Sequence, residues 1–152
     1  TKNLVITEFD GRPTVMFRMI NIRNNQILDS SVHATMLKGI ITKEGMPFRK
    51  FIDLKLLRSK VPLFSMSMNM MHIIDEESPF WGMKAGESFD SGTEILISAL
   101  GVDGTFGQMI HSSHLYTTKD LIWNKRFKDI VTVLGDGVRI IDYADFNELV
   151  DG

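Results

Sequence analysis

The sequence predicts an all-β fold, an immunoglobulin-like antiparallel β-sandwich with one or two short helices. Two observations carry this prediction. The chain is a succession of short segments in which apolar residues alternate with polar ones, separated by turn signals. No long segment repeats its apolar residues with the 3.6-residue period of a helix. Many short strands at regular spacing are typical of sandwiches, in which two sheets bury one face each against the other.

The first half of the chain contains five predicted strands. Residues 4–9 and 13–22 flank Asp10-Gly11, a pair that favours the tight turn of a hairpin. Residues 26–42 form a long strand that ends at the Glu44-Gly45 turn. Residues 48–57 and 62–74 follow, joined by a basic turn at residues 58–60.

The second half begins after a loop rich in Gly, Ser and Asp at residues 82–92. Residues 93–100 and 105–116 are predicted strands on either side of a glycine-rich turn. Residues 130–134 and 138–142 are expected to form a hairpin at Asp136-Gly137. Two segments look like short helices, residues 117–123, with Thr117 or Thr118 as a cap, and residues 143–150.

The composition is that of one globular domain spanning residues 1–152. Seventeen basic residues against 19 acidic ones give a net charge of −2, which argues against nucleic acid as a partner and against a polybasic membrane tail. The absence of cysteine excludes a disulfide scaffold and thiolate chemistry, and it is compatible with a reducing cytoplasm. No apolar run approaches the roughly 18 residues needed to cross a bilayer. Because the chain starts at Thr1, inside a strand-like segment, we interpret it as part of a longer polypeptide.

No pattern in the chain points to an enzyme or to a metal site. His111 and His114 lie three residues apart in a predicted strand, where that spacing turns them to opposite faces. The chain contains neither a His-Glu-x-x-His motif nor a Gly-x-Ser-x-Gly nucleophile turn. We therefore expect no catalytic residue, no metal ligand and no cofactor. Met66, Met68 and Met70 share one face of a predicted strand, and core packing is favoured there over an adaptable binding surface.

Gly101, Gly104 and Gly107 allow two interpretations. A phosphate-binding loop must open a helix, and here the chain continues as strand, so that reading fails. The glycines then either provide unusual backbone angles in a wide hairpin or line a constriction where subunits approach closely. The residues alone favour the hairpin.

Glu44 and Lys38 also allow two interpretations, an ordinary one and a functional one. Glu44, at a strand end, is either solvated or one member of a ring of carboxylates around an axial pathway, which would concentrate cations. Lys38 is either solvent-facing or one of several basic side chains that converge on a lipid phosphate. The sequence alone cannot show such convergence.

Three segments, followed by a fourth, carry a resemblance to a known family. Residues 15–46 hold an Arg-x-x-Asn-x-Arg element, with Arg18, Asn21 and Arg23, before a long strand and a Glu-Gly turn. Residues 72–79 hold His-x-Ile-Asp-x-x-Ser-Pro, and residues 94–127 hold the glycine turn and a Leu-Ile-Trp step. Residues 138–146 follow with Asp-Tyr-x-x-Phe. In order and spacing these motifs resemble the cytoplasmic domain of inward-rectifier potassium channels, above all the prokaryotic members, which share the character of residues 44–49.

The resemblance implies a fold and an assembly. The domain would be an immunoglobulin-like sandwich that follows the second transmembrane helix, and four copies would form a ring that extends the potassium pathway. The glycine turn, at Gly101, Gly104 and Gly107, would form a narrow girdle with Phe106 as a bulky obstruction. The ring needs head-to-tail interfaces between subunits.

The resemblance also implies charged sites. Glu44 matches a pore-lining acid associated with intracellular magnesium and polyamines, which plug the pore at outward potentials and leave conduction inward-favouring. Leu100 stands where strong rectifiers have a further acid, and Asp103, the nearest acid to it, is the second candidate for the pore lining beside Glu44. Residues 54–57 lack the pore-facing aspartate of some animal members, so we expect weaker polyamine binding than in strong rectifiers. Lys38 matches a basic position linked to membrane phosphoinositides.

The sequence therefore favours a cytoplasmic pore and regulatory domain of a prokaryotic inward-rectifier potassium channel. It would form a homotetramer at the cytoplasmic face of the bacterial inner membrane, joined to the membrane-embedded pore part of the same polypeptide. Anionic lipid headgroups would be further partners. The alternative is a free-standing β-sandwich module that binds a protein or a small ligand, because a fold alone does not fix function.

Overall fold

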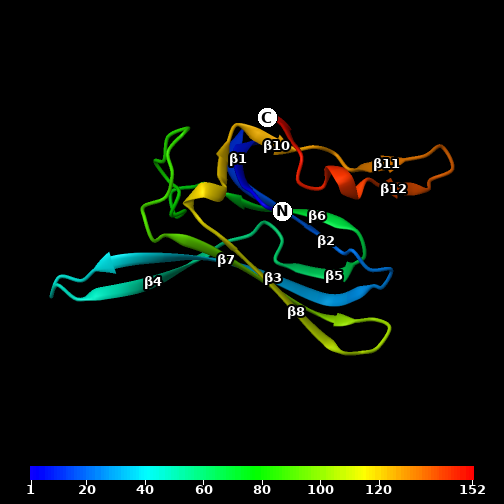
Figure 1. Ribbon diagram of the computed structural model, residues 1–152, viewed down its shortest axis with the longest axis horizontal. Coiled ribbons are helices and arrows are strands. Elements are labelled where there is room, and N and C mark those ends of the chain that lie inside the picture. Colours follow the sequence, from blue (N-terminus) through cyan, green and yellow to red (C-terminus); the bar gives the residue numbers. More distant parts are fainter.

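The structure, a computed structural model, describes residues 1–152 and consists of two main β-sheets packed face to face (Figure 1). The first sheet has the strand order β6-β2-β1-β9, and the second has the order β4-β3-β7-β8, with β5 paired to the start of β3. Two small sheets, β10-β13 and β11-β12, lie near the C-terminus. The predicted all-β sandwich is confirmed. The strands of the main sheets are β1 (Leu4–Phe9), β2 (Arg12–Ile20), β3 (Ile27–Ile41), β4 (Pro47–Leu54), β5 (Lys60–Phe64), β6 (Ser67–Ile73), β7 (Glu94–Asp103), β8 (Met109–Tyr116) and β9 (Leu121–Trp123).

The core lies between the two main sheets, where side chains of a strand alternate inward and outward. Val32, Ala34 and Met36 of β3 turn inward with Ile95 and Ile97 of β7, and each is at most 5% exposed. The facing sheet contributes Leu4, Ile6, Val15, Phe17 and Met70. Because full burial of one such side chain stabilises the fold by about 1.5–3 kcal/mol, this layer holds the sandwich together.

A smaller apolar layer covers the other face of the first sheet. Val5 and Met16 turn away from the main core and pack against Phe127 of β10 (Lys125–Phe127). β10 pairs with β13 (Leu149–Asp151), so the C-terminal strands shield this face. The alternation of β1 and β2 thus serves two cores, and this explains why both strands are apolar on both faces.

One predicted strand, residues 62–74, is wrong, because the structure divides it into β5 and β6. β5 pairs with β3 in the second sheet, whereas β6 pairs with β2 in the first. The chain crosses between sheets at residues 65–66, where the Asn21 amide donates to the Met66 carbonyl at 2.9 Å. Both β5 and β6 bury apolar side chains, so the hydrophobic run in the sequence continues across the corner. The pattern of apolar residues therefore does not indicate where the chain changes sheets.

The two predicted helices, residues 117–123 and 143–150, shrink to single 3₁₀ turns. These are Thr118–Asp120 and Tyr143–Asp145, and each is followed by a strand, β9 and β13 respectively. The Thr117 cap is confirmed: its amide and hydroxyl both donate to the Asp120 carboxylate, at 2.7 and 2.9 Å. β9 pairs in parallel with β1, the one parallel contact of the sheet, and this pairing replaces further helical turns.

Two long hairpins extend beyond the sandwich at opposite ends (Figure 1). The β3–β4 hairpin turns at residues 42–46, and the β7–β8 hairpin turns at residues 104–108. The predicted hairpin at Asp136-Gly137 is also present, between β11 (Val131–Val133) and β12 (Arg139–Ile141). The chain thereby separates the two segments to which the sequence assigned functional roles.

Candidate functional site

The glycine turn joins β7 to β8 and is tightly hydrogen-bonded. The Asp103 amide donates to the Gln108 carbonyl at 2.8 Å, and the Gly107 amide donates to the Asp103 carbonyl at 2.7 Å. Gly107 has a φ of +66°, a left-handed backbone that glycine adopts without strain. Phe106, at the tip, is 77% exposed. The turn therefore presents a bulky side chain to the outside from a well-defined backbone.

Gly101 and Gly104 permit a close approach between β7 and the start of β3. A Cβ at Gly101 would lie 2.5 Å from Ile27 Cγ2 and 3.0 Å from Ser30 Oγ. A Cβ at Gly104 would lie 3.0 Å from the Gln26 carbonyl oxygen, which accepts a hydrogen bond from the Gly104 amide at 2.8 Å. Packing within one chain is therefore enough to require glycine at these two positions, whatever part they have in contacts between chains.

Asp103 is an internal brace of the turn. Its side chain accepts hydrogen bonds from the amides of Thr105 and Phe106, at 2.7 and 3.1 Å, and from the Asn25 side-chain amide at 2.7 Å. The two backbone amides are the main reason that the pKa of Asp103 lies below its ordinary value; Asn25 and the charge of Arg23 add to the effect. Asp103 is only 5% exposed in the single subunit, because its carboxylate is turned toward these donors.

The Arg-x-x-Asn-x-Arg element connects to this turn through side chains. The Asn21 amide group donates to the Asn25 carbonyl at 2.8 Å, and its side-chain oxygen accepts from the Arg23 amide at 3.0 Å. Asn25 in turn donates to Asp103, as described above. The residues between β2 and β3 are thereby linked to the glycine turn, far along the sequence.

Arg18 points away from the glycine turn and toward the C-terminal strands. Its Nε donates to Asn69 Oδ1 at 3.0 Å and its Nη2 to the Lys128 carbonyl at 2.6 Å, and the guanidinium lies 5.0 Å from the centre of the Phe127 ring. Burial lowers the pKa of Arg18, and nearby Asp129 opposes the shift. Arg18 therefore joins the first sheet to the C-terminal segment.

Glu44 lies at the exposed tip of the β3–β4 hairpin. A hydrogen bond from the Thr42 side chain, with a smaller backbone contribution, lowers the pKa of its carboxyl group. The glycine turn packs on the first residues of β3, whereas Glu44 follows the last, so the two are separated by the length of a 15-residue strand. Within one subunit, the structure does not bring Glu44 and the glycine turn together.

Asp29 is an acidic residue near the glycine turn that the family resemblance does not point to. The register of β3 against β7 shifts between Leu28 and Ser31, and Asp29, within this bulge, has a φ of +46°. A left-handed backbone at a residue other than glycine is a local strain that structures retain where the surroundings require it. Asp29 is exposed and lies beside the residues that lead into the turn. The alternation of apolar and polar residues is interrupted at residues 28–31, and this interruption is the signal in the sequence for the bulge.

Lys38 lies on β3 directly opposite Lys50 of β4, and its Nζ is 3.1 Å from the Asp90 carboxylate. The Lys38 side chain is 41% exposed and that of Asp90 75%, so the pair is a surface ion pair that contributes little to stability. Lys38 and Lys50 therefore bring two positive charges close together on the β3–β4 hairpin.

The histidines have structural environments. Nδ1 of His72 lies 2.9 Å from the Lys55 carbonyl and Nε2 lies 2.8 Å from Ser78 Oγ, so the ring donates to one and accepts from the other. Burial lowers the pKa of His72. No group of three His, Cys, Asp or Glu residues is arranged to hold a metal ion. None of the helices has the length and apolar composition of a membrane span.

Comparison with known proteins places the chain in a family. Residues 1–151 match the inward rectifier potassium channel C-terminal domain, and the chain belongs to this family. It is 39% identical over 149 residues to the inward rectifier potassium channel Kirbac3.1 of Paramagnetospirillum magnetotacticum, across 98% of this chain and 50% of that protein. It is 30% identical over 148 residues to the G protein-activated inward rectifier potassium channel 2 of Rattus norvegicus, across 95% of this chain and 35% of that protein.

The chain thus spans half or less of the length of these relatives. The predicted family is confirmed, and with it the interpretation that the domain is not an enzyme, because the matched proteins are potassium channels. The particular roles of the site residues stay predictions.

Proposed function

We propose that the chain is the cytoplasmic, pore-extending domain of an inward-rectifier potassium channel, and that four copies form a ring on the ion pathway. The observation that carries the proposal is the family match over residues 1–151. It is supported by a glycine turn whose backbone is fixed while its tip, Phe106, is exposed. Such a turn is suited to a constriction in which four copies meet at the ring axis.

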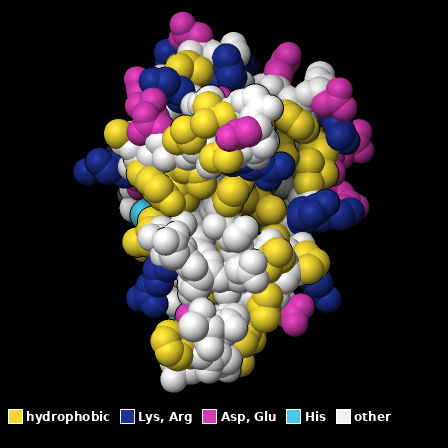
Figure 2. Space-filling view, turned by 90° about the vertical axis from the view of Figure 1, so that its right-hand side faces the viewer, with side chains coloured by type: hydrophobic (Ala, Val, Ile, Leu, Met, Phe, Trp, Pro, Cys, Tyr) yellow, Lys and Arg dark blue, Asp and Glu magenta, His cyan; other side chains and the backbone are white.

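The exposed hydrophobic side chains suit an assembly of several subunits. On the β3–β4 hairpin, Ile41, Met46, Phe48 and Phe51 are between 57% and 69% exposed. Figure 2 shows the opposite end of the molecule, where hydrophobic side chains are exposed across the upper middle, with a few charged ones among them and more toward the edges. Contiguous exposed apolar surface marks interaction sites in soluble domains. A closed ring uses two different faces of each subunit, and these two ends supply them.

Two exposed acids are candidates for the lining of the proposed pathway. Glu44 supplies a carboxylate at the hairpin tip, and Asp29 supplies one beside the glycine turn. Four copies of either would form an acidic ring that attracts magnesium or polyamines, and mutual repulsion would raise the mean pKa of the ring. We assign Asp103 a different part: its carboxylate braces the turn, and through the turn it sets the position of Phe106.

In the proposed channel the domain lies at the cytoplasmic face of the bacterial inner membrane, and Lys38 meets anionic lipid headgroups. The Lys38 side chain is half-exposed, and its partner Asp90 is exposed as well. A headgroup phosphate can therefore reach Lys38 and take the place of Asp90 in the ion pair. Selectivity for potassium resides in the membrane part of the polypeptide. The gate works by movement of the four domains against one another, which changes the opening between the glycine turns.

The test is potassium flux through the complete channel polypeptide in liposomes, with magnesium or spermine added on the domain's side. Glu44→Gln and Asp29→Asn should each weaken block several-fold, whereas Glu76→Gln, a change at another exposed acid, should leave it unchanged. Block that is unaffected by both pathway substitutions would exclude an acidic ring at either position. Absence of potassium flux in the unaltered channel would contradict the proposal as a whole.

A further inference from the structure

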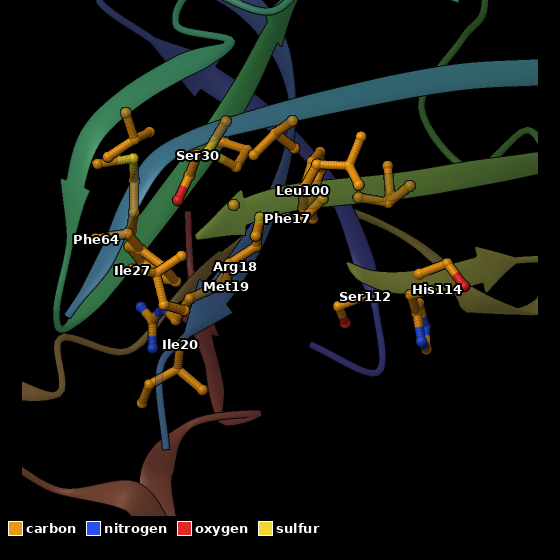
Figure 3. Close-up of a pocket in the computed structure, with 18 of the residues that line it drawn as sticks. Phe17, Arg18, Met19, Ile20, Ile27, Ser30, Phe64, Leu100, Ser112 and His114 are labelled. Atoms are coloured by element: carbon orange, nitrogen blue, oxygen red, sulfur yellow. The ribbon is translucent and has the colours of Figure 1, made fainter. Parts of the chain in front are cut away.

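A cavity of about 350 Å³ lies between the two main sheets, on the side of β8 (Figure 3). Its size is at the lower end of the roughly 300–1,000 Å³ of small-molecule sites. Fifteen of its 23 lining residues are hydrophobic, and they come from both sheets. Those that carry the argument are Phe17, Met19, Phe64, Met68, Met70 and Ala99.

The cavity has no side chain of Asp, Glu or Lys on its walls. Arg18 contributes to the lining, but its guanidinium bonds to Asn69 and Lys128 and lies against Phe127, on the other face of the first sheet. Without a carboxylate the site offers nothing to a cation. Arg18 is the one Lys or Arg among the lining residues, and because its guanidinium is engaged on that other face, it is turned away from an anion in the cavity. The occupant that suits such walls is uncharged and mostly apolar.

Two buried side-chain atoms among the lining residues have no partner, Nη1 of Arg18 and Oγ of Ser30, and of these only Ser30 belongs to the inward-facing set between the sheets. Ser30 is 6% exposed, and its Oγ makes no hydrogen bond. Buried polar groups in folded proteins are nearly always hydrogen-bonded, so an exception requires an explanation. Ser30 belongs to the inward-facing set of β3, and Figure 3 shows its hydroxyl pointing from β3 into the space beside Phe64. The hydroxyl is able to donate or accept one hydrogen bond.

The cavity has an entrance along β8. By its register against β7, β8 turns Ile110, Ser112, His114 and Tyr116 toward the inside of the sandwich. Tyr116 is buried, whereas Ser112 and His114 are exposed although they face inward. The first sheet does not cover this part of β8, so a molecule can enter past these two side chains.

We propose that this cavity binds a small uncharged molecule, a ring system with one hydrogen-bonding group that pairs with Ser30 Oγ. Leu100 and Gly101 are part of the wall and lead directly into the glycine turn. A bound molecule therefore contacts the strand that positions the turn. Any effect on a gate rests on the proposed channel function, whereas the binding itself does not.

The test uses NMR of the 152-residue chain with ¹³C-labelled methionine methyl groups. Met19, Met68 and Met70 line the cavity, and Met46, exposed on the distant hairpin, serves as an internal control. The probes are indole, which has one N–H donor, and indene, which has the same shape without it. Indole should shift the three cavity methyl signals in a saturable way, bind more tightly than indene, and leave Met46 unchanged.

Two neighbouring serines supply matched variants. Ser30→Ala should weaken indole binding about two- to tenfold and remove its advantage over indene, because the loss is that of one neutral hydrogen bond. Ser31→Ala, on the outward face of β3, should leave both affinities unchanged. Ala99→Leu, which fills the cavity, should abolish binding of both probes while the Met46 signal keeps its position.

Several results would overturn the proposal. They are the absence of saturable shifts up to the solubility limit of indole, equal affinities for indole and indene in the unaltered chain, and equal shifts at Met46. Should Ala99→Leu fail to fold, the comparison of Ser30→Ala with Ser31→Ala decides the matter alone. Because none of these measurements involves ion flux, a failed channel assay and a failed binding assay are separate outcomes.

Discussion

The Asn25 side-chain amide donates a hydrogen bond of 2.7 Å to Oδ2 of Asp103, and this bond fastens the β2–β3 connection to the glycine turn. The other oxygen of the same carboxylate holds the amides of Thr105 and Phe106. The shape of the turn therefore depends on a residue almost 80 positions earlier in the chain. Two motifs that resemble the channel family are thereby linked, because Asn21 of the Arg-x-x-Asn-x-Arg element bonds to Asn25 and Asn25 bonds to the glycine turn.

We predict that Asn25→Ala loosens the turn without unfolding the sandwich. The carboxylate of Asp103 loses one of its three donors, so the turn opens more often to solvent. Hydrogen exchange should become faster at the amides of Thr105 and Phe106 and stay unchanged in the β1–β2 pair. Asn24→Ala is the matched control, because Asn24 is exposed and makes no side-chain hydrogen bond. Equal exchange in both variants would show that Asn25 does not brace the turn.

We predict that Gly101→Ala destabilises the domain by about 1–3 kcal/mol, as overpacking of a well-packed site does. The new methyl group would meet Ile27 Cγ2 at 2.5 Å. Gly39→Ala is the control, because its Cβ would have no atom within 4 Å and the change should be neutral or stabilising. Urea denaturation measures both. A smaller cost of Gly101→Ala in an Ile27→Ala background, which lacks Cγ2, would identify the clash, whereas equal effects of Gly101→Ala and Gly39→Ala would contradict it.

Stability should depend on pH through His72. Burial depresses the pKa of His72 in the folded state, so between that value and about 6.5 the unfolded chain binds more protons. The contribution of neutral His72 to the free energy of unfolding is therefore complete above about pH 6.5, and it is lost as the pH falls toward the pKa of His72 in the folded state. Denaturation at pH 7.5 and 5.5 should give the lower stability at 5.5.

The variant His72→Gln isolates this contribution. It should be less stable at pH 7.5 by about 1–3 kcal/mol, because the partners Lys55 and Ser78 lose hydrogen bonds in a buried place. It should also show a smaller difference between the two pH values. A remaining difference is expected, because burial also lowers the pKa of His114. An undiminished difference in His72→Gln would mean that other groups carry the pH dependence.

The proposed lipid contact predicts a difference between two opposed lysines. Lys38→Gln in the complete channel should weaken the response of potassium flux to anionic lipid in liposomes, because it removes the charge that a headgroup phosphate would meet. Lys50→Gln is the control. Lys50 lies opposite Lys38 on the neighbouring strand β4, so this change removes an equal charge close by and should leave the lipid response unchanged. Identical lipid titrations for Lys38→Gln and the unaltered channel would remove Lys38 from the account.

The sequence predicted the layers of this fold well, because strand periodicity and hairpin turns are local properties. Most strands of the main sheets lie close to where alternation placed them, and Asp10-Gly11 and Asp136-Gly137 do mark hairpins. The corner at residues 65–66 was missed because apolar side chains are needed on both sides of it. The helices were overestimated because their final residues pair with strands distant in the sequence, β1 and β10.

The site was harder to predict than the fold, because its character depends on which way a side chain turns. Asp103 and Asp29 are both acids near the glycine turn, yet one is buried against amides and the other is exposed in a bulge. Spacing alone does not distinguish them. Ser30 carries no signal in the sequence, since a buried hydroxyl without a partner is recognisable only when the opposing sheet is in place.

The central claim is that the glycine turns of four subunits narrow one ion pathway, and its most direct test is a cysteine at Phe106. The chain has no native cysteine, so Phe106→Cys introduces the single thiol of this domain in each subunit, and the unaltered complete channel, treated in the same way, controls for the rest of the polypeptide. The measurement is potassium flux in liposomes before and after addition of Cd²⁺, which thiolates bind tightly. Val133→Cys, exposed on the β11–β12 hairpin, is the control. The account predicts that Cd²⁺ stops flux through Phe106→Cys and leaves Val133→Cys unaffected; undiminished flux through Phe106→Cys would contradict it.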